Sequence, residues 1–168
     1  VLFNHNTDAI RTGTGGIGAD DGILVRDLNG NGTIDSGREL FGIDTLKRDG
    51  KNAINGFDAL GDLDSNADGQ LTEADLLWNQ VMVWRDLDQN GISPTDELFR
   101  LAELHISRVG VNGSATNTTG GTQAGTTING NLIAQSASFT REVDGVQVNR
   151  TVGAIELESN AFYREFTI

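Results

Sequence analysis

The sequence contains no cysteine, a single proline, and only 12 basic residues against 24 acidic ones. The lack of cysteine excludes disulfide bonds and thiolate metal sites, and it fits a protein that is stable outside the cell without covalent cross-links. No run of about 20 apolar residues is present, so a membrane-spanning helix is not expected. No signal-peptide pattern begins at Val1. We therefore expect a soluble chain without membrane insertion that is a piece of a longer secreted or cell-surface protein.

The shortage of basic residues gives the 168-residue chain a formal net charge of −12. Because no basic patch can replace the counterions of phosphate, we do not expect a nucleic-acid partner. The length and the hydrophobic content of 37% fit one folded module over residues 1–168, expected to be a monomer. Within it we distinguish a part rich in acidic loops, 1–106, from a strand and hairpin part, 107–168.

Two acidic stretches, 64–75 and 86–97, repeat one calcium-loop pattern. Ca²⁺ takes about six to eight oxygen ligands, so alternate residues point inward, glycine in sixth place makes the sharp turn, and the seventh residue offers its carbonyl. One such loop alone is ordinarily a surface turn, but two full-length matches favour metal binding. The predicted ligands are Asp64, Asn66, Asp68, Gln70, Thr72 and Asp75 in the first loop, and Asp86, Asp88, Asn90, Ile92 and Glu97 in the second.

Two further stretches match the pattern less completely. In 27–39 the twelfth position is Arg38 and the acid comes one residue late, so the loop must accommodate an extra residue. In 4–10 most acids are replaced by asparagine, and alanine stands where glycine is expected. We predict a third calcium site in 27–39, and we leave open a fourth in 4–10, a worn copy of the pattern. The corresponding ligands are Asp27, Asn29, Asn31, Thr33, Asp35 and Glu39, followed by Asn4, Asn6, Asp8 and Ile10.

Helices are expected beside the calcium loops. Apolar residues recur every three positions in 56–63, which predicts a helix that enters loop 64–75. Thr72 and Asp75 read as the start of a helix at the end of that loop, and Ser93 with Pro94 read as the same signal in the next loop. A further apolar stripe predicts a helix over 97–104. This arrangement makes 64–75 an EF-hand candidate.

Strands are expected in the rest of the chain, at 23–25, 81–84 and 106–111. The ranges 132–142 and 146–158 alternate apolar and polar residues around Asp144-Gly145, which predicts a hairpin. The range 112–131 is rich in small polar residues and is expected to be a mobile surface loop. The predicted fold class is α+β, with short helices and EF-hand-like calcium loops packed beside a small antiparallel β-sheet or hairpin.

Three runs in fixed order, 22–42, 63–69 and 83–93, resemble the self-processing module of FrpC-like RTX proteins of Gram-negative bacteria. The resemblance implies a module that folds on binding Ca²⁺, cleaves an Asp-Pro bond at its own N-terminal edge, and joins the freed aspartyl end to a lysine amine. Here the only proline, Pro94, follows Ser93, so the chain holds no Asp-Pro bond. We therefore expect an N-terminally truncated module that has no catalytic residue and is inactive by itself.

Three functions follow from these observations. The first is a calcium-binding and calcium-folded module of a secreted RTX-type protein, either a toxin or an adhesin. The second is calcium-triggered Asp-Pro cleavage and Asp-Lys ligation in the full-length parent protein, which would make the parent an autoprocessing enzyme. The third is a calcium-dependent adhesin domain that holds a sugar or a peptide on the loop 112–131.

Overall fold

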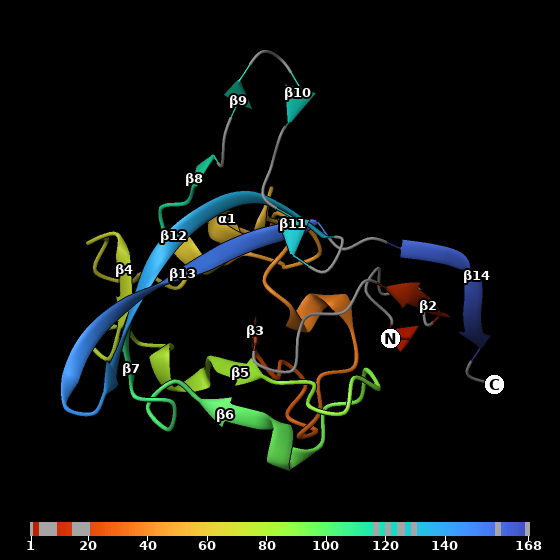
Figure 1. The fold of residues 1–168 in the computed structure, drawn as a ribbon, viewed down its shortest axis with the longest axis horizontal. Coiled ribbons are helices and arrows are strands. Elements are labelled where there is room, and N and C mark those ends of the chain that lie inside the picture. The colour runs from red at the N-terminus through yellow and green to blue at the C-terminus, as the bar shows by residue number, and fades with distance from the viewer. Residues whose placement is uncertain are drawn as a thin grey trace.

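The computed structural model describes residues 2–3, 10–14, 21–115, 118–119, 122–123, 127–128, 131–156 and 159–166, with side chains for 21–115 and 133–155. Within these residues strands greatly outnumber helices (Figure 1). The strands are β1 (Leu2–Phe3), β2 (Ile10–Thr14), β3 (Ile23–Val25), β4 (Gln70–Thr72), β5 (Met82–Trp84), β6 (Leu98–Arg100), β7 (Ile106–Gly110), β8 (Ser114–Ala115), β9 (Thr118–Thr119), β10 (Thr122–Gln123), β11 (Thr127–Ile128), β12 (Asn131–Val143), β13 (Val146–Glu156) and β14 (Ser159–Phe166). The helices are α1 (Gly56–Gly61) and the 3₁₀ turns η1 (Gly37–Glu39), η2 (Trp78–Gln80) and η3 (Thr95–Glu97).

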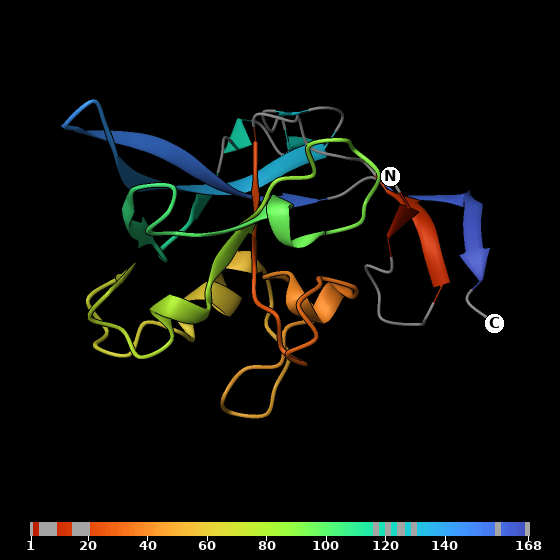
Figure 2. The ribbon, with the colours of Figure 1, turned by 90° about the horizontal axis from the view of Figure 1, so that it is seen from below.

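The strands pair antiparallel in every sheet of the described part. The largest sheet has the order β11-β12-β7-β4, and β8 and β13 also pair with β12. A second sheet has the order β3-β5-β6, and a third joins β1, β2 and β14 near both chain ends (Figure 1). Figure 2 shows the long blue hairpin β12–β13 on one side of the molecule and the orange to yellow loops on the other.

The predicted hairpin around Asp144-Gly145 is confirmed. Val143 pairs with Val146 across a two-residue turn, and both turn residues have positive φ, 51° for Asp144 and 78° for Gly145. Positive φ at both central positions defines the tight turn whose twist matches that of two antiparallel strands, and Asp-Gly favours it. The turn therefore fixes the register of the longest strand pair among the described residues.

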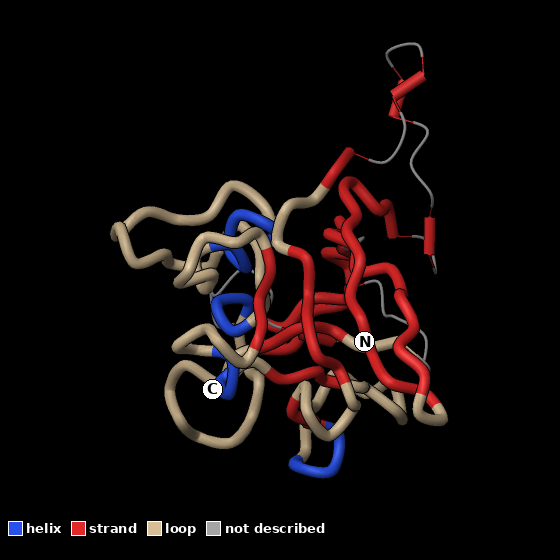
Figure 3. The backbone as a smooth tube through the Cα atoms, turned by 90° about the vertical axis from the view of Figure 1, so that its left-hand side faces the viewer, coloured by secondary structure: helices blue, strands red, loops and turns tan. Residues whose placement is uncertain are grey.

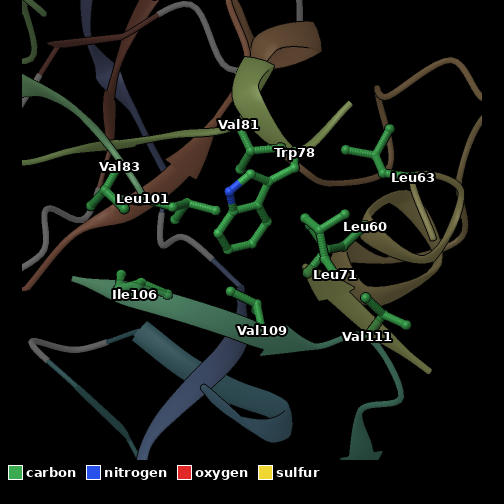
Figure 4. Packing of buried hydrophobic residues seen from close by; sticks show 10 residues of the cluster. All are labelled: Leu60, Leu63, Leu71, Trp78, Val81, Val83, Leu101, Ile106, Val109 and Val111. Atoms are coloured by element: carbon green, nitrogen blue, oxygen red, sulfur yellow. The ribbon is translucent and has the colours of Figure 1, made fainter. Parts of the chain in front are cut away.

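The larger hydrophobic core lies between α1, β4, η2 and the inner face of β7 (Figure 4). Leu71 and Val81 are 0% exposed, and Trp78 lies between side chains from separate segments of the chain. Full burial of an aliphatic side chain stabilises a fold by about 1.5–3 kcal/mol. Because Leu71 belongs to loop 64–75, this loop is attached to the core. The remaining members of the cluster are Leu60, Leu63, Val83, Leu101, Ile106, Val109 and Val111.

The predicted α+β class with EF-hand helices is wrong. Figure 3 shows a chain of strands and loops with few, short helices, and α1 is the single α-helix among the described residues. Helix 56–63 forms, although it ends at Gly61, but no α-helix follows loop 64–75: turns and η2 come after Asp75. The helix predicted over 97–104 does not form, because Leu98 to Arg100 form β6 against β5 and a turn brings Leu101 into the core. Pairing with a neighbouring strand overrides the weak helical preference of so short a stretch.

The other predicted strands form nearly as expected, as β3, β5 and β7. Trp84, at the end of β5, is 3% exposed. Loop 4–9 lies outside the described residues, and so does much of 112–131, where β8, β9, β10 and β11 are the described parts. The mobility of that range and the division at residue 106 stay predictions.

The start of α1 offers a test that does not involve the calcium loops. Asp58 Oδ2 accepts the N–H of Ile54 at 2.9 Å, and Asn55 Oδ1 accepts the N–H of Asp58 at 2.8 Å. The bond from Ile54 N–H to the Asp58 carboxylate, together with Lys47 Nζ at 3.1 Å, lowers the pKa of Asp58 from its ordinary value of 3.8. Reciprocal capping of this kind satisfies two N–H groups at a helix start.

We expect Asp58→Asn to lower the free energy of unfolding by about 0.5–1 kcal/mol at neutral pH, because the variant loses the charge that strengthens the cap. Since the folded-state pKa is depressed, the contribution exists above pH 3.8 and disappears as the pH falls through the lower folded value. Urea unfolding of both proteins between neutral and acid pH measures it. Asp49→Asn, in the neighbouring exposed turn, should change stability less; equal losses would contradict the assignment.

Candidate metal centres

The acidic loops 27–39, 64–75 and 86–97 share one backbone conformation. In each, the fourth and sixth residues have positive φ, whether or not the fourth is glycine. Non-glycine residues adopt this conformation at a steric cost, so the rest of the loop must hold it in place. The six φ values are 72° at Gly30 and 81° at Gly32, 59° at Ala67 and 85° at Gly69, and 58° at Gln89 and 75° at Gly91.

The same hydrogen bonds recur in all three loops. The carboxylate of the first residue accepts the N–H of the sixth, and the carboxylate that ends the loop accepts the N–H of the second. The first set joins Gly32 to Asp27 at 2.8 Å, Gly69 to Asp64 at 2.8 Å and Gly91 to Asp86 at 3.1 Å. The second set joins Leu28 to Glu39 at 3.1 Å, Ser65 to Asp75 at 2.7 Å and Leu87 to Glu97 at 2.8 Å. Each loop therefore folds its end acids toward its own backbone.

Loop 86–97 also brings three carboxylates together. One oxygen from each of Asp86, Asp88 and Glu97 lies within 4.8 Å of the others, the one group of its kind within the described residues. Asp86 and Glu97 are buried, with 6% and 5% exposed, while Asp88 is exposed. Clustered carboxylate oxygens suit a hard divalent cation such as Ca²⁺. The group could therefore hold a metal ion.

The electrostatics of this group favour a cation. Burial raises the pKa of Asp86, the charges of Glu97 and Asp88 raise it further, and the N–H groups of Gly91 and Asn90 partly oppose these effects. Because the folded protein then holds the proton of Asp86 more tightly than the unfolded chain does, ionised Asp86 destabilises the metal-free fold at neutral pH. A bound divalent ion would remove that destabilisation.

Glu97 is positioned by the strands on both sides of its loop. Its backbone carbonyl accepts the N–H of Arg85 at 2.9 Å, and its Oε2 accepts the indole N–H of Trp84 at 3.4 Å. Trp84 ends β5, and Glu97 ends η3, immediately before β6. The predicted helix start at Ser93-Pro94 is therefore the 3₁₀ turn η3 rather than an α-helix, with Pro94 as its N-cap.

Loop 27–39 accommodates its extra residue and still presents a buried acid. Glu39 is 3% exposed, its Oε1 accepts the N–H of Leu28, and its Oε2 accepts the N–H of Asp35 at 2.9 Å. Arg38, which occupies the twelfth position, is exposed. Glu39 thus takes the place in this loop that Glu97 takes in loop 86–97.

Loop 64–75 ends in aspartate, one methylene shorter than the glutamates that end the other two loops. Asp75 is 4% exposed, and burial alone would raise its pKa, but the N–H groups of Thr72 and Ser65 and the Ser65 hydroxyl together lower it. Asp75 Oδ1 accepts from Ser65 at 2.7 Å, and Oδ2 accepts from Thr72 N–H at 2.9 Å. Both oxygens of this short carboxylate are therefore already engaged by the protein.

The spatial pairing of the loops differs from their order in the sequence. Loops 64–75 and 86–97 are close in sequence, but the structure joins 86–97 to 27–39 through the pairing of β3 with β5 and a buried cluster of Val25, Ile34 and Trp84. Loop 64–75 belongs to the other sheet, because its β4 pairs with β7. The ligand assignments in the three loops stay predictions, and those at Asn4, Asn6 and Asp8 lie outside the described residues, with Ile10 at the start of β2.

Two residues in or beside these loops make contacts that the sequence did not indicate. Trp84, which belongs to the core, also donates to Glu97. Ser93 was treated only as a helix start, although its hydroxyl is 2.6 Å from the backbone nitrogen of Ile34. Both loops begin in an Arg-Asp-Leu segment, at Arg26 and at Arg85. Aligning these segments would have placed Ile34 and Ser93 at the same position, the eighth residue of each loop.

The chain matches known proteins along most of its length. Residues 1–152 match the family model of the SPM domain. Over 141 residues the chain is 46% identical to the iron-regulated protein FrpA of Neisseria meningitidis serogroup C. The matched segment covers 84% of this chain and 12% of FrpA. The chain thus spans about an eighth of that relative. In the described residues we find no helix with the length and apolar character needed to cross a membrane.

Proposed function

The chain belongs to the SPM domain family of FrpA- and FrpC-like self-processing modules, and on that premise we propose that it is a module that binds calcium and is folded by it. The observation that carries the proposal is the group of Asp86, Asp88 and Glu97, whose carboxylate oxygens lie within 4.8 Å of one another. Two of these acids are buried. Like charges held this close are unfavourable unless a cation joins them.

The conformation shared by the three loops extends the proposal to 27–39 and 64–75. In each loop the third and fifth side chains accept backbone N–H groups two residues further on, as Asn66 does from Asp68 at 3.0 Å. A loop so ordered has its side-chain oxygens grouped before an ion arrives, which reduces the entropy lost on binding. We expect loop affinities on the order of 10⁻⁵–10⁻³ M, the range from weak sensors to extracellular calcium modules.

Calcium titration of the protein, after bound metal has been removed with a chelator, tests this function directly. Native mass spectrometry should show bound Ca²⁺ at millimolar calcium, and isothermal titration should give saturable binding. Mg²⁺ should bind more weakly, because it demands a small octahedral site and gives up its waters reluctantly. Asp49→Asn removes an exposed carboxylate outside the loops and serves as the control for charge alone. A chain that retains no calcium under these conditions would contradict the proposal.

Family membership favours a second function, self-processing by the longer parent protein. A carboxylate beside a tertiary amide can attack its own carbonyl and release the proline amine, and the resulting anhydride can acylate a lysine amine. In this chain the only proline follows Ser93, so the scissile bond would have to lie elsewhere in the parent. Calcium-dependent appearance of two fragments from the parent on a denaturing gel would support this function, and a parent without an Asp-Pro bond upstream would remove it.

Secretion and placement in an RTX-type protein follow from the same family membership and are likewise proposals. The absence of cysteine is consistent with them, because acidic loops and calcium would then replace disulfide bonds as the stabilising links.

A further inference from the structure

We propose that Ser93 is a positioning residue that couples loops 27–39 and 86–97, so that the two loops bind calcium as one cooperative unit while loop 64–75 binds independently. The inference rests on the proposed calcium function. It concerns how the sites are regulated, and not whether they bind.

The two coupled loops occupy equivalent places in one sheet. Each follows a strand and returns to it: Val25 bridges Leu40 around the first loop, and Trp84 pairs with Leu98 around the second. The closing hydrogen bonds match as well, from Arg26 N–H to the Glu39 carbonyl at 2.8 Å and from Arg85 N–H to the Glu97 carbonyl at 2.9 Å. Since β3 and β5 are antiparallel partners, the two loops emerge from neighbouring strands.

Ser93 joins the eighth positions of these loops directly. Its hydroxyl oxygen accepts the N–H of Ile34 at 2.6 Å, and the same hydroxyl donates to the Ile34 carbonyl at 3.2 Å. Ser93 is 1% exposed and Ile34 is 2% exposed, so solvent has little access to replace either partner. A single side chain thus satisfies both backbone polar groups of a residue 59 positions away.

The position of Ser93 explains why this link transmits binding. It follows Ile92, whose carbonyl is a proposed ligand, and Ile34 follows Thr33, whose carbonyl has the same role in the other loop. An ion that fixes either carbonyl also fixes the next residue, and therefore one end of the Ser93–Ile34 link. If one loop loses its ordered form, buried polar groups in the other lose their partner, which is unfavourable. Occupancy of one loop therefore favours the ordered form of its neighbour.

In the described residues, the eighth position of loop 64–75 is bonded elsewhere. Its eighth residue, Leu71, pairs with Val109 in β7, and its Gly69 carbonyl accepts the N–H of Val111 at 3.1 Å. Its backbone hydrogen bonds thus run to the sheet of β7 and β12, and what it shares with β5 is the apolar packing of Leu71 and Val83. An ion in this loop should therefore leave the other two affinities unchanged. It provides an internal control.

The amides of the three sixth-position glycines report the loops separately. In ¹H–¹⁵N spectra of the full chain titrated with CaCl₂, Gly32, Gly69 and Gly91 should each shift as their own loop fills. We expect Glu39→Gln to raise the calcium midpoint of Gly91 about fivefold or more, the low end of typical coupling between sites. Asp75→Asn should leave that midpoint within about twofold. In a chain that already carries Ser93→Ala, adding Glu39→Gln should no longer change the calcium midpoint of Gly91.

Controls separate this coupling from loss of stability. Thr140→Ala removes another buried hydroxyl, 5% exposed and bonded to Arg108 and Asn149, and it should lower stability while the fivefold effect of Glu39→Gln persists. If Ser93→Ala does not fold, the comparison of Glu39→Gln with Asp75→Asn in the Ser93 chain still decides whether the pair is coupled. The inference is overturned if Glu39→Gln leaves the calcium midpoint of Gly91 unchanged. It is also overturned if Glu39→Gln shifts that midpoint equally with serine and with alanine at position 93. If no glycine amide responds to calcium, the proposed function itself fails.

Discussion

Removing calcium with an excess of chelator is expected to lower the free energy of unfolding by several kcal/mol. At a calcium concentration 100 times the dissociation constant, each occupied site stabilises the folded state by about 2.7 kcal/mol. The coupled loops alone would then contribute about 5 kcal/mol. Since domains are typically stable by about 5–15 kcal/mol, the calcium-free chain should be loosened or partly unfolded.

The structure explains why the effect should reach beyond the loops. Ile34 and Trp84 are buried in one cluster although each lies in or next to an acidic loop. Glu39, Asp86 and Glu97 are buried as well. All three lie in loops that connect to the sheet of β3, β5 and β6. Without a cation, the repulsion between Asp86 and Glu97 opposes the packing of the side chains that form this cluster.

Thermal unfolding followed by circular dichroism, in CaCl₂, in MgCl₂ and in chelator, measures the effect. Calcium should raise the midpoint far more than magnesium does. Ionic strength must be matched with NaCl, because a net charge of −12 makes compaction sensitive to salt alone. Identical melting and identical compactness in calcium and chelator, with no ion retained, would contradict calcium-dependent folding.

The acidic loops could be found from the sequence because their signal is local. Alternating oxygen side chains around a glycine define the turn within about a dozen residues, and Gly69 and Gly91 have the positive φ that the pattern requires. The Asp144-Gly145 hairpin was predictable for the same reason. In each case the residues that determine the structure are also neighbours in the chain.

Features that depend on distant contacts were not predictable. Leu98, Leu101 and Leu104 have helical spacing, but Leu98 pairs with Trp84 in β5, and nothing local reveals that strand. Likewise, the pairing of loop 27–39 with loop 86–97 is set by β3 and β5, which lie more than 50 residues apart in the chain. Periodicity in so short a segment is compatible with a helix or a buried strand, and the tertiary partner decides between them.

Replacing Glu97 by glutamine should weaken calcium binding more than replacing Asp75 by asparagine. Glu97 is longer and belongs to the three-carboxylate group, and glutamate at the end of a calcium loop can supply both oxygens to the ion. The carboxylate oxygens of both acids already accept hydrogen bonds, but the bonds differ in length. Asp75 accepts from Ser65 at 2.7 Å and from Thr72 at 2.9 Å, whereas one oxygen of Glu97 has only a 3.4 Å bond from the Trp84 indole. An ion therefore competes with a weaker hydrogen bond at that oxygen of Glu97 than at either oxygen of Asp75.

For Glu97→Gln we expect the calcium affinity of loop 86–97 to fall by about 10- to 100-fold or more. Replacing a residue that only hydrogen-bonds to a metal ligand already causes a loss of that size. The Gly91 amide shift reports this loop, and the Gly69 shift reports the loss at loop 64–75 in Asp75→Asn. Trp84 fluorescence gives a second measure for Glu97, because its indole N–H donates to the replaced carboxylate. Glu103→Gln is the matched control: Glu103 accepts the N–H of Arg100 at 2.6 Å outside every loop, so both affinities should persist. A larger loss in Asp75→Asn than in Glu97→Gln would reverse the proposed ranking and place the principal ion in loop 64–75.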